Sequence, residues 1–472
     1  MAGKLLAPER VLPTLNADGT RRLIRPKLYK GKKYRARLIT AWALIALFVA
    51  IPFIRMNGKP LILLDVPRRQ FHLFGHTFLP TDGVLLMFLL LSIFVAIFWV
   101  TALVGRVWCG WGCPQTVYME YVFRPIERLF EGGRAAQLRL DRKGPGLRRT
   151  AKYAVFAVVS VLLGNLFLSY FVGVDTLWIW IRRSPVDHPA SFLVMAVTAG
   201  LVFFDFAYFR EQMCTVICPY ARFQSVLLDK KSLIIGYDER RGEPRGKGKP
   251  RPGEGDCIDC NACFVACPTG IDIREGLQLE CIACAQCVDA CNSIMDAIHK
   301  PRGLIRYTSQ ESLETGKKTR LVRPRVLIYP ALFAVFFGAL LLMGSREGSA
   351  DVTVLRGLTA PYVIDPTGIQ NQIRVKIENR SGSAQAYQIR LDGADGARFI
   401  APENPLRVAD GEHQTTTVFV IAPPSLFHDG ARRVTFHIDD GRGFKTDVPY
   451  KLLGPEHEAD GEPHRQHEQE HP

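Results

Sequence analysis

The sequence has 472 residues, 48% of them hydrophobic, and carries a net charge of +15 from 60 Lys and Arg against 45 Asp and Glu. A mean hydropathy of +0.06 over this length argues against a single soluble globule and indicates apolar segments alternating with polar ones. The basic residues cluster beside the apolar segments, which favours a membrane as the partner and argues against nucleic acid.

Five apolar segments approach or reach the ~20 residues that a helix needs to cross a bilayer. The first contains Pro52 and is short, and no cleavable signal peptide is expected because a basic segment, residues 1–37, precedes it. The predicted spans are 38–54, 83–105, 153–174 and 190–209, which form a membrane domain over 38–237, and 326–344.

The distribution of Lys and Arg predicts an orientation in the membrane. Their number is 11 before residue 38, 4 in 55–82, 10 in 106–152, 2 in 175–189 and 19 in 210–325. High and low counts alternate, so the positive-inside rule places the N-terminus and the 106–152 and 210–325 segments in the cytoplasm, and the C-terminal region outside. The 14 basic residues after 344 do not oppose this, because long domains translocate largely regardless of charge.

Each of the first two helix pairs ends in a basic residue followed by Cys-x-x-x-Cys-Pro. Cysteines four apart share one face of a helical turn, so the four thiolates could converge at the cytoplasmic surface of the membrane. A thiolate site favours Cu(I) over Cu(II), but buried cysteines can also serve only as small packing residues. The two copies comprise Arg106, Cys109, Cys113 and Pro114, and Arg210, Cys214, Cys218 and Pro219.

Other polar and sulfur-containing residues near these motifs could take part. Asp205 lies inside a predicted span, where ionisable residues usually face a functional interior. Glu120 and Glu127 could supply oxygen ligands, although a solvated helix face is the favoured interpretation. Met119 and Met213 are soft neighbours that are expected to pack. His72 and His76 could bind a metal, but are predicted to lie in an ordinary interfacial loop.

Eight further cysteines follow a predicted flexible linker, 238–255, and are followed by a basic linker, 301–325. They form two C-x2-C-x2-C-x3-C runs, in which three thiolates hold one cube and the fourth cysteine of each run holds the other. Zinc knuckles or disulfides are the alternatives. The sequence predicts a bacterial-type two-cluster ferredoxin domain over 256–300, with one [4Fe-4S] cluster on Cys257, Cys260, Cys263 and Cys291 and the other on Cys281, Cys284, Cys287 and Cys267.

Beyond residue 344 the pattern changes to alternating apolar and polar residues, as in Val352–Leu355, Arg374–Ile377, Tyr387–Leu391, Thr415–Val420 and Val434–Ile438. Such strands predict an all-β immunoglobulin-like sandwich over 350–453. An acidic, His-containing tail, 454–472, is expected to be disordered. The predicted fold is therefore a multi-domain membrane protein with five transmembrane helices, a cytoplasmic ferredoxin domain and an external sandwich.

With these motifs in this order, the chain resembles the cytochrome c oxidase accessory protein family, called CcoG, FixG or RdxA, over nearly its whole length. One departure is Asn292 after Cys291, where a proline often stands. The resemblance implies a protein of the bacterial inner membrane that reduces Cu(II) to Cu(I) for assembly of a cbb-type oxidase, with copper near Cys109, Cys113, Cys214 and Cys218. The expected partners are membrane lipid, a cytosolic electron donor, a copper ATPase, copper chaperone or oxidase assembly factors, and, as a further possibility, a second copy of the chain.

Two other functions remain open from the sequence. One is a quinol-oxidising electron-transfer subunit in which the Cys-x-x-x-Cys-Pro pairs are structural. The other is a scaffold whose clusters sense oxygen or redox state and whose external domain binds the oxidase.

Overall fold

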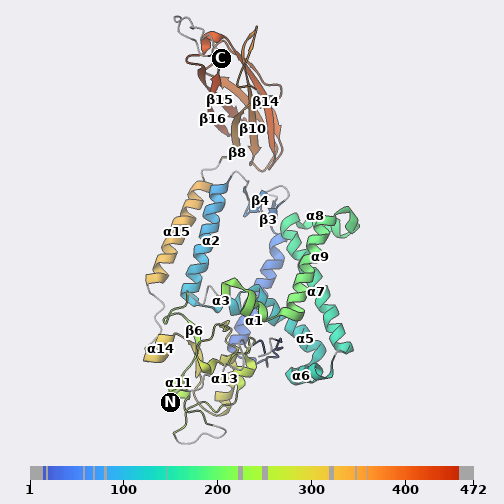
Figure 1. The fold of residues 1–472 in the computed structure, drawn as a ribbon, viewed down its shortest axis with the longest axis vertical. Coiled ribbons are helices and arrows are strands. Elements are labelled where there is room, and N and C mark those ends of the chain that lie inside the picture. The colour runs from blue at the N-terminus through green and yellow to red at the C-terminus, as the bar shows by residue number, and fades with distance from the viewer. Residues whose placement is uncertain are drawn as a thin grey trace, which may run out of the picture. The chain divides into compact units, whose positions relative to one another are not determined.

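The computed structural model describes residues 14–16, 20–56, 59–66, 70–78, 82–144, 146–221, 227–246, 253–317, 324–345, 348–358 and 360–455. The chain is divided into two compact units, Met1–Leu341 and Leu342–Pro472. The first unit contains the long helices and all twelve cysteines, and the second consists mainly of strands (Figure 1).

In the described residues, five helices are long and apolar enough to cross a membrane, as the sequence predicts. The first begins at Lys32 rather than at residue 38, because the Asp289 carboxylate accepts hydrogen bonds from the amides of Lys33 and Tyr34, at 3.2 and 2.7 Å, and so caps its first turn. The five are α1 (Lys32–Ala50, continued as a 3-10 turn Ile51–Phe53), α2 (Gly83–Val104), α7 (Leu147–Val172), α9 (Pro189–Phe204, continued as a π-helix Asp205–Phe209) and α15 (Pro324–Gly344).

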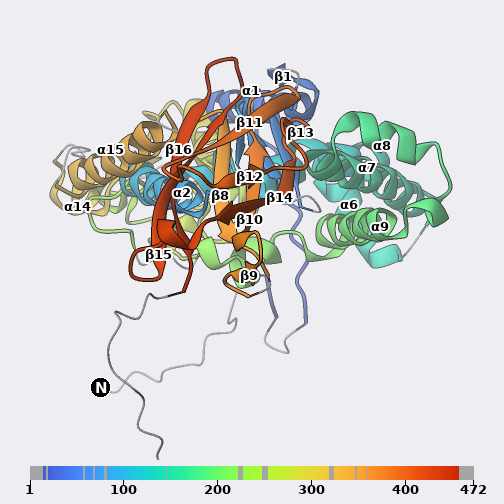
Figure 2. The same ribbon diagram turned by 90° about the horizontal axis from the view of Figure 1, so that it is seen from above.

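The membrane helices pack through small and aromatic residues. The close approach of α7 and α9 needs Gly164, since a Cβ there would lie 3.2 Å from the Ala199 side chain. The pair α2 and α15 is joined by ring contacts such as that of Trp99 with Phe333, whose centroids are 6.0 Å apart. Figures 1 and 2 both show these two pairs side by side.

Shorter helices follow the spans. These are α3 (Val107–Trp111), α4 (Pro114–Tyr118), a π-helix (Met119–Phe123), α5 (Arg124–Glu131) and α6 (Arg134–Lys143) after α2, α8 (Val174–Ile181) after α7, and a π-helix (Met213–Ile217) after α9.

The segment between α1 and α2 forms strands rather than the predicted loop. His72 lies in β4 and His76 in β5, and the buried His72 ring is hydrogen-bonded to Thr77 at 2.8 Å. A two-stranded sheet joins β1 (Arg55–Met56) to β2 (Lys59–Pro60), and a three-stranded sheet joins β3 (Ile62–Asp65), β4 (Gln70–Leu73) and β5 (His76–Phe78).

The cysteine-rich segment is enclosed by an antiparallel pair, β6 (Ile234–Tyr237) with β7 (Ile305–Thr308). The sequence predicts a flexible linker over 238–255, but its described part packs on the cysteine segment: α11 (Glu239–Gly242) follows β6, and the Gly246 amide donates to the Cys257 carbonyl. Residues 247–252 lie outside the described residues, as do 318–323 of the second linker. The remaining helices are α12 (Ala262–Ala266), α13 (Gln286–Ala297) and α14 (Gln310–Thr315).

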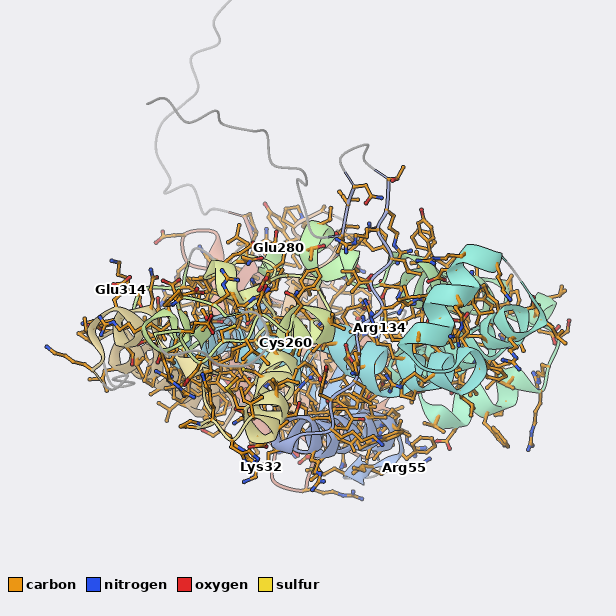
Figure 3. The ribbon with its side chains drawn as sticks, turned by 90° about the horizontal axis from the view of Figure 1, so that it is seen from below. Lys32, Arg55, Arg134, Cys260, Glu280 and Glu314 are labelled. Atoms are coloured by element: carbon orange, nitrogen blue, oxygen red, sulfur yellow. The ribbon has the colours of Figure 1, made fainter. Side chains whose placement is uncertain are left out.

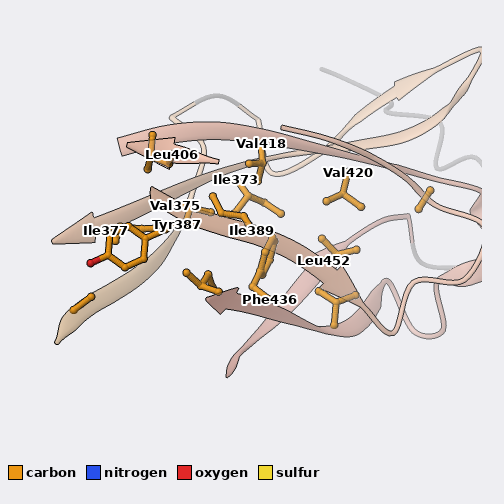
Figure 4. Close-up of a cluster of buried hydrophobic side chains, with 14 of the residues drawn as sticks. Ile373, Val375, Ile377, Tyr387, Ile389, Leu406, Val418, Val420, Phe436 and Leu452 are labelled. Carbon is orange, nitrogen blue, oxygen red and sulfur yellow. The ribbon is translucent and has the colours of Figure 1, made fainter. Parts of the chain in front are cut away.

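The second unit is the predicted sandwich of two antiparallel sheets, in the orders β12-β14-β10-β8 (with β9 on β10) and β13-β11-β15-β16. Figure 4 shows the core between them, where residues such as Ile373, Val418 and Phe436 are fully buried. All five predicted strand segments lie within strands. The bounds are β8 (Ala350–Arg356), β9 (Val363–Asp365), β10 (Gly368–Asn379), β11 (Gln385–Asp392), β12 (Arg398–Ile400), β13 (Leu406–Val408), β14 (His413–Ala422), β15 (Ala431–Asp439) and β16 (Lys445–Leu453). The tail is predicted over 454–472, and residues 456–472 of it lie outside the described residues.

Candidate iron–sulfur and thiol site

The two C-x2-C-x2-C runs have the same backbone conformation. Asp259 and Asn261 in the first run have φ of 48° and 55°, and Ala283 and Ala285 at the equivalent positions of the second have φ of 53° and 58°. Left-handed residues that alternate with right-handed ones turn successive amide groups toward one side and make a concave anion site, as is common around iron–sulfur clusters. Both loops therefore have the backbone shape that an anionic cluster needs.

The first three cysteines of each run, together with the last cysteine of the other run, line an apolar cavity. The fourth cysteine of each run lies at the cavity of the other run, the grouping that the spacing predicts for the ligands, and Cys263 borders both cavities. A cluster with four thiolate ligands fits this donor set. One cavity contains Cys257, Cys260, Cys263 and Cys291, and the other contains Cys267, Cys281, Cys284 and Cys287 beside Cys263.

Of the eight cysteines around these cavities, four are buried, three are half-buried and Cys260 is exposed, and none of the twelve in the chain forms a disulfide. Burial raises the pKa of Cys281 to about 12 and that of Cys284 to about 11. Binding of a metal by such thiols must displace their protons. Among the described residues, no three His, Cys, Asp or Glu side chains are grouped as ligands of a single metal ion.

The substitution of Asn292 for proline has a structural reason. After Cys267, Pro268 follows the end of α12, whereas α13 continues through Cys291 and Asn292 to Ala297. A proline at 292 would remove a helical amide donor. The Asn292 side chain instead accepts a hydrogen bond from the Gly303 amide at 3.0 Å and so fixes the chain leading into β7.

The two Cys-x-x-x-Cys-Pro motifs also share one conformation. Gly105 ends α2 with φ 61° and ψ −133°, and Arg210 ends the span of α9 with φ 55° and ψ −123°, each four residues before the first cysteine of its motif. Both second cysteines, Cys113 and Cys218, are extended and precede a proline that begins a helix. The repeat is thus real, but Arg210 corresponds to Gly105 and not, as the sequence suggests, to Arg106.

All four cysteines of these motifs lie within electrostatic range of one another, although no three of them are grouped as ligands of a single metal ion in the described structure. Cys214 interacts electrostatically with Cys109, Cys113 and Cys218. Burial raises the pKa of the Cys109, Cys113 and Cys214 thiols. We call Cys109, Cys113, Cys214 and Cys218 the thiol quartet. The structure therefore brings together two pairs that lie 105 residues apart in the sequence. It does so differently from the predicted shared helix face, because Cys113 and Cys218 are extended and lie outside the helical turns of Cys109 and Cys214.

The thiol quartet is packed directly against the second cluster-binding loop. Cys109 and Cys214 belong to one buried cluster with Ile282 and Cys284. Gly110, between Cys109 and Cys113, approaches this loop so closely that a Cβ on it would lie 2.7 Å from the Cys284 Cα and 2.5 Å from the Ile282 carbonyl oxygen. Only glycine fits here.

A hydrogen-bonded tyrosine joins the same two loops. The Tyr307 hydroxyl donates to the Ala283 carbonyl at 2.7 Å and accepts from the indole of Trp111 at 2.9 Å. Ala283 belongs to the second cluster-binding loop and Trp111 to the first Cys-x-x-x-Cys motif. No sequence pattern marks Tyr307 as a functional residue, because a lone tyrosine in a strand is ordinary.

The structure also places the neighbouring candidate residues. Asp205 lies near the thiol quartet, where it interacts with Cys214 and accepts a hydrogen bond at 3.1 Å from Gln115, which follows Cys113-Pro114. Met119 packs with Phe123 in a hydrophobic core, as expected of a packing residue. Met213 begins the π-helix that contains Cys214.

Glu120 and Glu127 are buried, so the prediction of a solvated helix face is wrong. Glu127 accepts from Arg210 at 2.8 and 3.0 Å and from Arg25 at 2.6 Å, with Lys152 at 3.5 Å. Burial raises the pKa of Glu127, but Arg210, Arg25 and Lys152 outweigh it and hold that pKa well below its usual range. These contacts fix Arg210, the residue that turns the chain into the second Cys-x-x-x-Cys motif.

Replacement of Glu127 by Gln is expected to destabilise the first unit by about 3–5 kcal/mol, because three buried cations would lose their shared carboxylate. Thermal unfolding of the detergent-solubilised protein measures this as a lower midpoint. Glu314→Gln, which removes the exposed carboxylate paired with Lys230 at 3.7 Å, is the matched control and should change the midpoint little. Equal midpoints for the two variants would contradict the structural role of Glu127.

Comparison with known proteins agrees with this arrangement. Three family models match: a 4Fe-4S dicluster domain over residues 209–310, a 4Fe-4S binding domain over 86–132, and the IG-like fold at the C-terminus of FixG over 340–455. Protein RdxA of Cereibacter sphaeroides is 35% identical over 372 residues, which cover 75% of this chain and 79% of that protein. The chain belongs to the FixG/RdxA family.

Other relatives match over more of the length. Nitrogen fixation protein FixG of Rhizobium meliloti is 30% identical and the match covers 91% of this chain and 92% of FixG, and protein RdxB of Cereibacter sphaeroides is 34% identical with 84% and 88% covered. The chain is therefore a membrane-bound iron–sulfur electron-transfer protein of the FixG/RdxA type, with an immunoglobulin-like C-terminal domain.

Proposed function

We propose that this FixG/RdxA protein is a cupric reductase that takes electrons from a cytosolic donor, passes them through two [4Fe-4S] clusters and delivers them to Cu(II) at the thiol quartet. The reduced copper would serve the maturation of a cbb-type cytochrome c oxidase. The observation that carries the proposal is the contact of Gly110 with Cys284, which leaves no intervening residue between the second cluster-binding loop and the thiol quartet.

The proposed ligands follow the cavity linings. Cys257, Cys260, Cys263 and Cys291 would hold the first cluster, and Cys267, Cys281, Cys284 and Cys287 the second. When bound, the clusters supply one-electron conduction. The chain's own residues bury the thiolates, cradle them with backbone amides and bring the second loop against the quartet.

Electrons would enter at the first cluster. Cys260 is the exposed member of the twelve cysteines, and Figure 3 shows it among the side chains at the end of the unit that carries the ferredoxin segment. A soluble donor can dock there, while the second cavity, which lies against the thiol quartet, is the exit. The positive-inside distribution supports a cytoplasmic location for both cavities in the inner membrane.

The reaction balances as a one-electron transfer. Each electron that leaves the donor reduces one Cu(II) to one Cu(I), and no bond to carbon or oxygen is formed or broken. Thiolates bind the soft Cu(I) more strongly than Cu(II), so the quartet favours the product of the reduction. Release would then pass Cu(I) to a copper ATPase, a chaperone or an oxidase assembly factor, with the chain acting alone or as a homo-oligomer.

Serine at all four quartet positions tests this function. We expect Cu(II) reduction, followed anaerobically with a Cu(I)-specific chelator, to fall to the rate without protein while iron content and the cluster signals in electron paramagnetic resonance stay unchanged. Unchanged reduction with intact clusters would overturn the copper site. A loss of iron in the variant would instead assign the quartet to a further cluster, a relevant outcome because the 4Fe-4S model over 86–132 contains only Cys109 and Cys113.

The same preparation distinguishes the cupric reductase from a quinol-oxidising subunit. Reduction of the clusters by a quinol, with no Cu(II) reduction in the wild type, would make the protein a quinol-oxidising subunit and overturn the cupric reductase.

A further inference from the structure

Arg37 is a fully buried cation of α1 that lies against the thiol quartet and the second cluster-binding loop. Its side chain is 1% exposed, and its Nε donates to the Gly110 carbonyl at 2.9 Å. Its two terminal nitrogens have no hydrogen-bond partner in the described part of the chain. The guanidinium lies over the Tyr121 ring, 5.7 Å from its centroid, and interacts electrostatically with Cys284 and Tyr307.

Arg106 occupies the other side of the same loop. It is buried, its Nη1 donates to the Leu279 carbonyl, and its charge acts on both Cys109 and Cys281. Neither Arg37 nor Arg106 forms an ion pair with a carboxylate among the described residues, although Glu120 lies within electrostatic range of Arg37. The second cavity thus has two buried positive charges that are not neutralised at short range.

The first cavity differs in this respect. Arg274, which borders it, is paired with Asp272 and with Asp259, the latter at 2.6 Å. Arg241, whose charge reaches Cys291, is paired with Asp256 at 2.5 Å. The cations around the first cavity are therefore compensated by carboxylates, and those around the second are not.

We propose that Arg37 and Arg106 set the direction of electron flow by raising the reduction potential of the second cluster above that of the first. This inference rests on the two clusters of the proposed function but not on the copper site. A cluster gains one negative charge when it is reduced, and an unpaired buried cation stabilises that charge strongly because little water screens it. The guanidinium of a buried arginine keeps its charge, because arginine does not lose its proton in proteins.

The electron balance is simple. One electron leaves the cluster on the Cys257 run, which is oxidised by one unit, and enters the cluster on the Cys281 run, which is reduced by one unit. No proton needs to move, because both arginines stay charged. The donor of the proposed function refills the first cluster.

A potentiometric titration of the full-length protein, monitored by electron paramagnetic resonance, tests the proposal. We expect Arg37→Gln to lower the potential of one cluster only, so that the equilibrium constant for transfer between the clusters falls about tenfold, equivalent to about 59 mV for a one-electron step. Arg37→Lys should retain most of the wild-type potential, because it keeps the charge. Arg35→Gln, at an exposed position on the same helix, should leave both potentials unchanged.

The outcomes are separable from those of the proposed function. An Arg37→Gln protein with both clusters intact and unshifted potentials, or with equal shifts in Arg37→Gln and Arg37→Lys, would overturn the role of the charge. If Arg37→Gln does not fold with its iron, Arg106→Gln takes its place with the same expected shift, and an unshifted potential there overturns the proposal. Failure of Cu(II) reduction alone leaves these potentials measurable, whereas a wild type with a single cluster would overturn the proposed function itself.

Discussion

Cys291→Ser is expected to abolish the cluster that the other run of cysteines holds, and to leave the cluster beside the thiol quartet in place. Cys291 lies in the second run of the sequence, but its side chain lines the cavity of Cys257, Cys260 and Cys263. Serine is a much weaker ligand for iron than a thiolate, because soft thiolates are the ligands that iron–sulfur clusters select. The purified variant should therefore lose about four of its eight iron atoms.

Cys267→Ser is the matched variant, since Cys267 lines the cavity of Cys281, Cys284 and Cys287. Electron paramagnetic resonance of the two reduced variants should show two different single-cluster spectra that together account for the wild-type spectrum. Cys291→Ser should also retain a second cluster that chemical reductants can load and Cu(II) can reoxidise. If each variant instead lost the cluster of its own run, the crosswise assignment would be wrong.

The sequence predicts the place of a residue in this site well when that place follows from the residues next to it in the chain. The cysteine runs are local: their spacing fixes which thiols can surround one cube, and the cavity linings agree with the predicted crosswise sets. The apolar spans are local as well. Two helices, α1 and α7, begin six residues before the predicted spans, and α1 does so because its cap is Asp289, a residue far away in the sequence.

The charged residues could not be placed in the same way. Glu127 follows a pattern that is typical of a solvated helix face, and Arg37 lies within a basic segment that the positive-inside rule already explains. The burial of Glu127 depends on Arg25 and Arg210, which come from other segments of the chain, whereas Arg37 is buried against the Gly110 carbonyl with no carboxylate ion pair in the described part of the chain. A sequence shows that a charge is present, but not whether the folded chain supplies its counter-charge.

The internal repeat shows a further limit. In the sequence, the basic residues Arg106 and Arg210 suggest the alignment of the two motifs. The backbone instead aligns Arg210 with Gly105, in a region of φ and ψ that glycine adopts freely and arginine only at a cost of about 1–3 kcal/mol. Arg210 tolerates this conformation because Glu127 holds its side chain in two hydrogen bonds.

Gly110→Ala is expected to slow electron transfer from the second cluster to the thiol quartet, while both clusters and the four quartet cysteines stay in place. The new methyl group would lie 2.5 Å from the Ile282 oxygen and 2.7 Å from the Cys284 Cα, which are backbone atoms that cannot rotate away. The two loops must then separate, with an overpacking cost of about 1–3 kcal/mol. Cluster reduction by a chemical donor should stay normal, whereas stopped-flow mixing with Cu(II) should show that most of the rate of cluster reoxidation is lost.

Gly200→Ala is the control for this change. Gly200 lies in α9 with open space around its Cα, so the added methyl group should be tolerated and should even stabilise the helix by about 1 kcal/mol. Wild-type reoxidation by Cu(II) in Gly110→Ala, with iron content equal in both variants, would show that electrons do not reach copper through the contact of Gly110 with Cys284. The path would then have to leave the second cluster at a surface other than the one where Gly110 packs against Ile282 and Cys284.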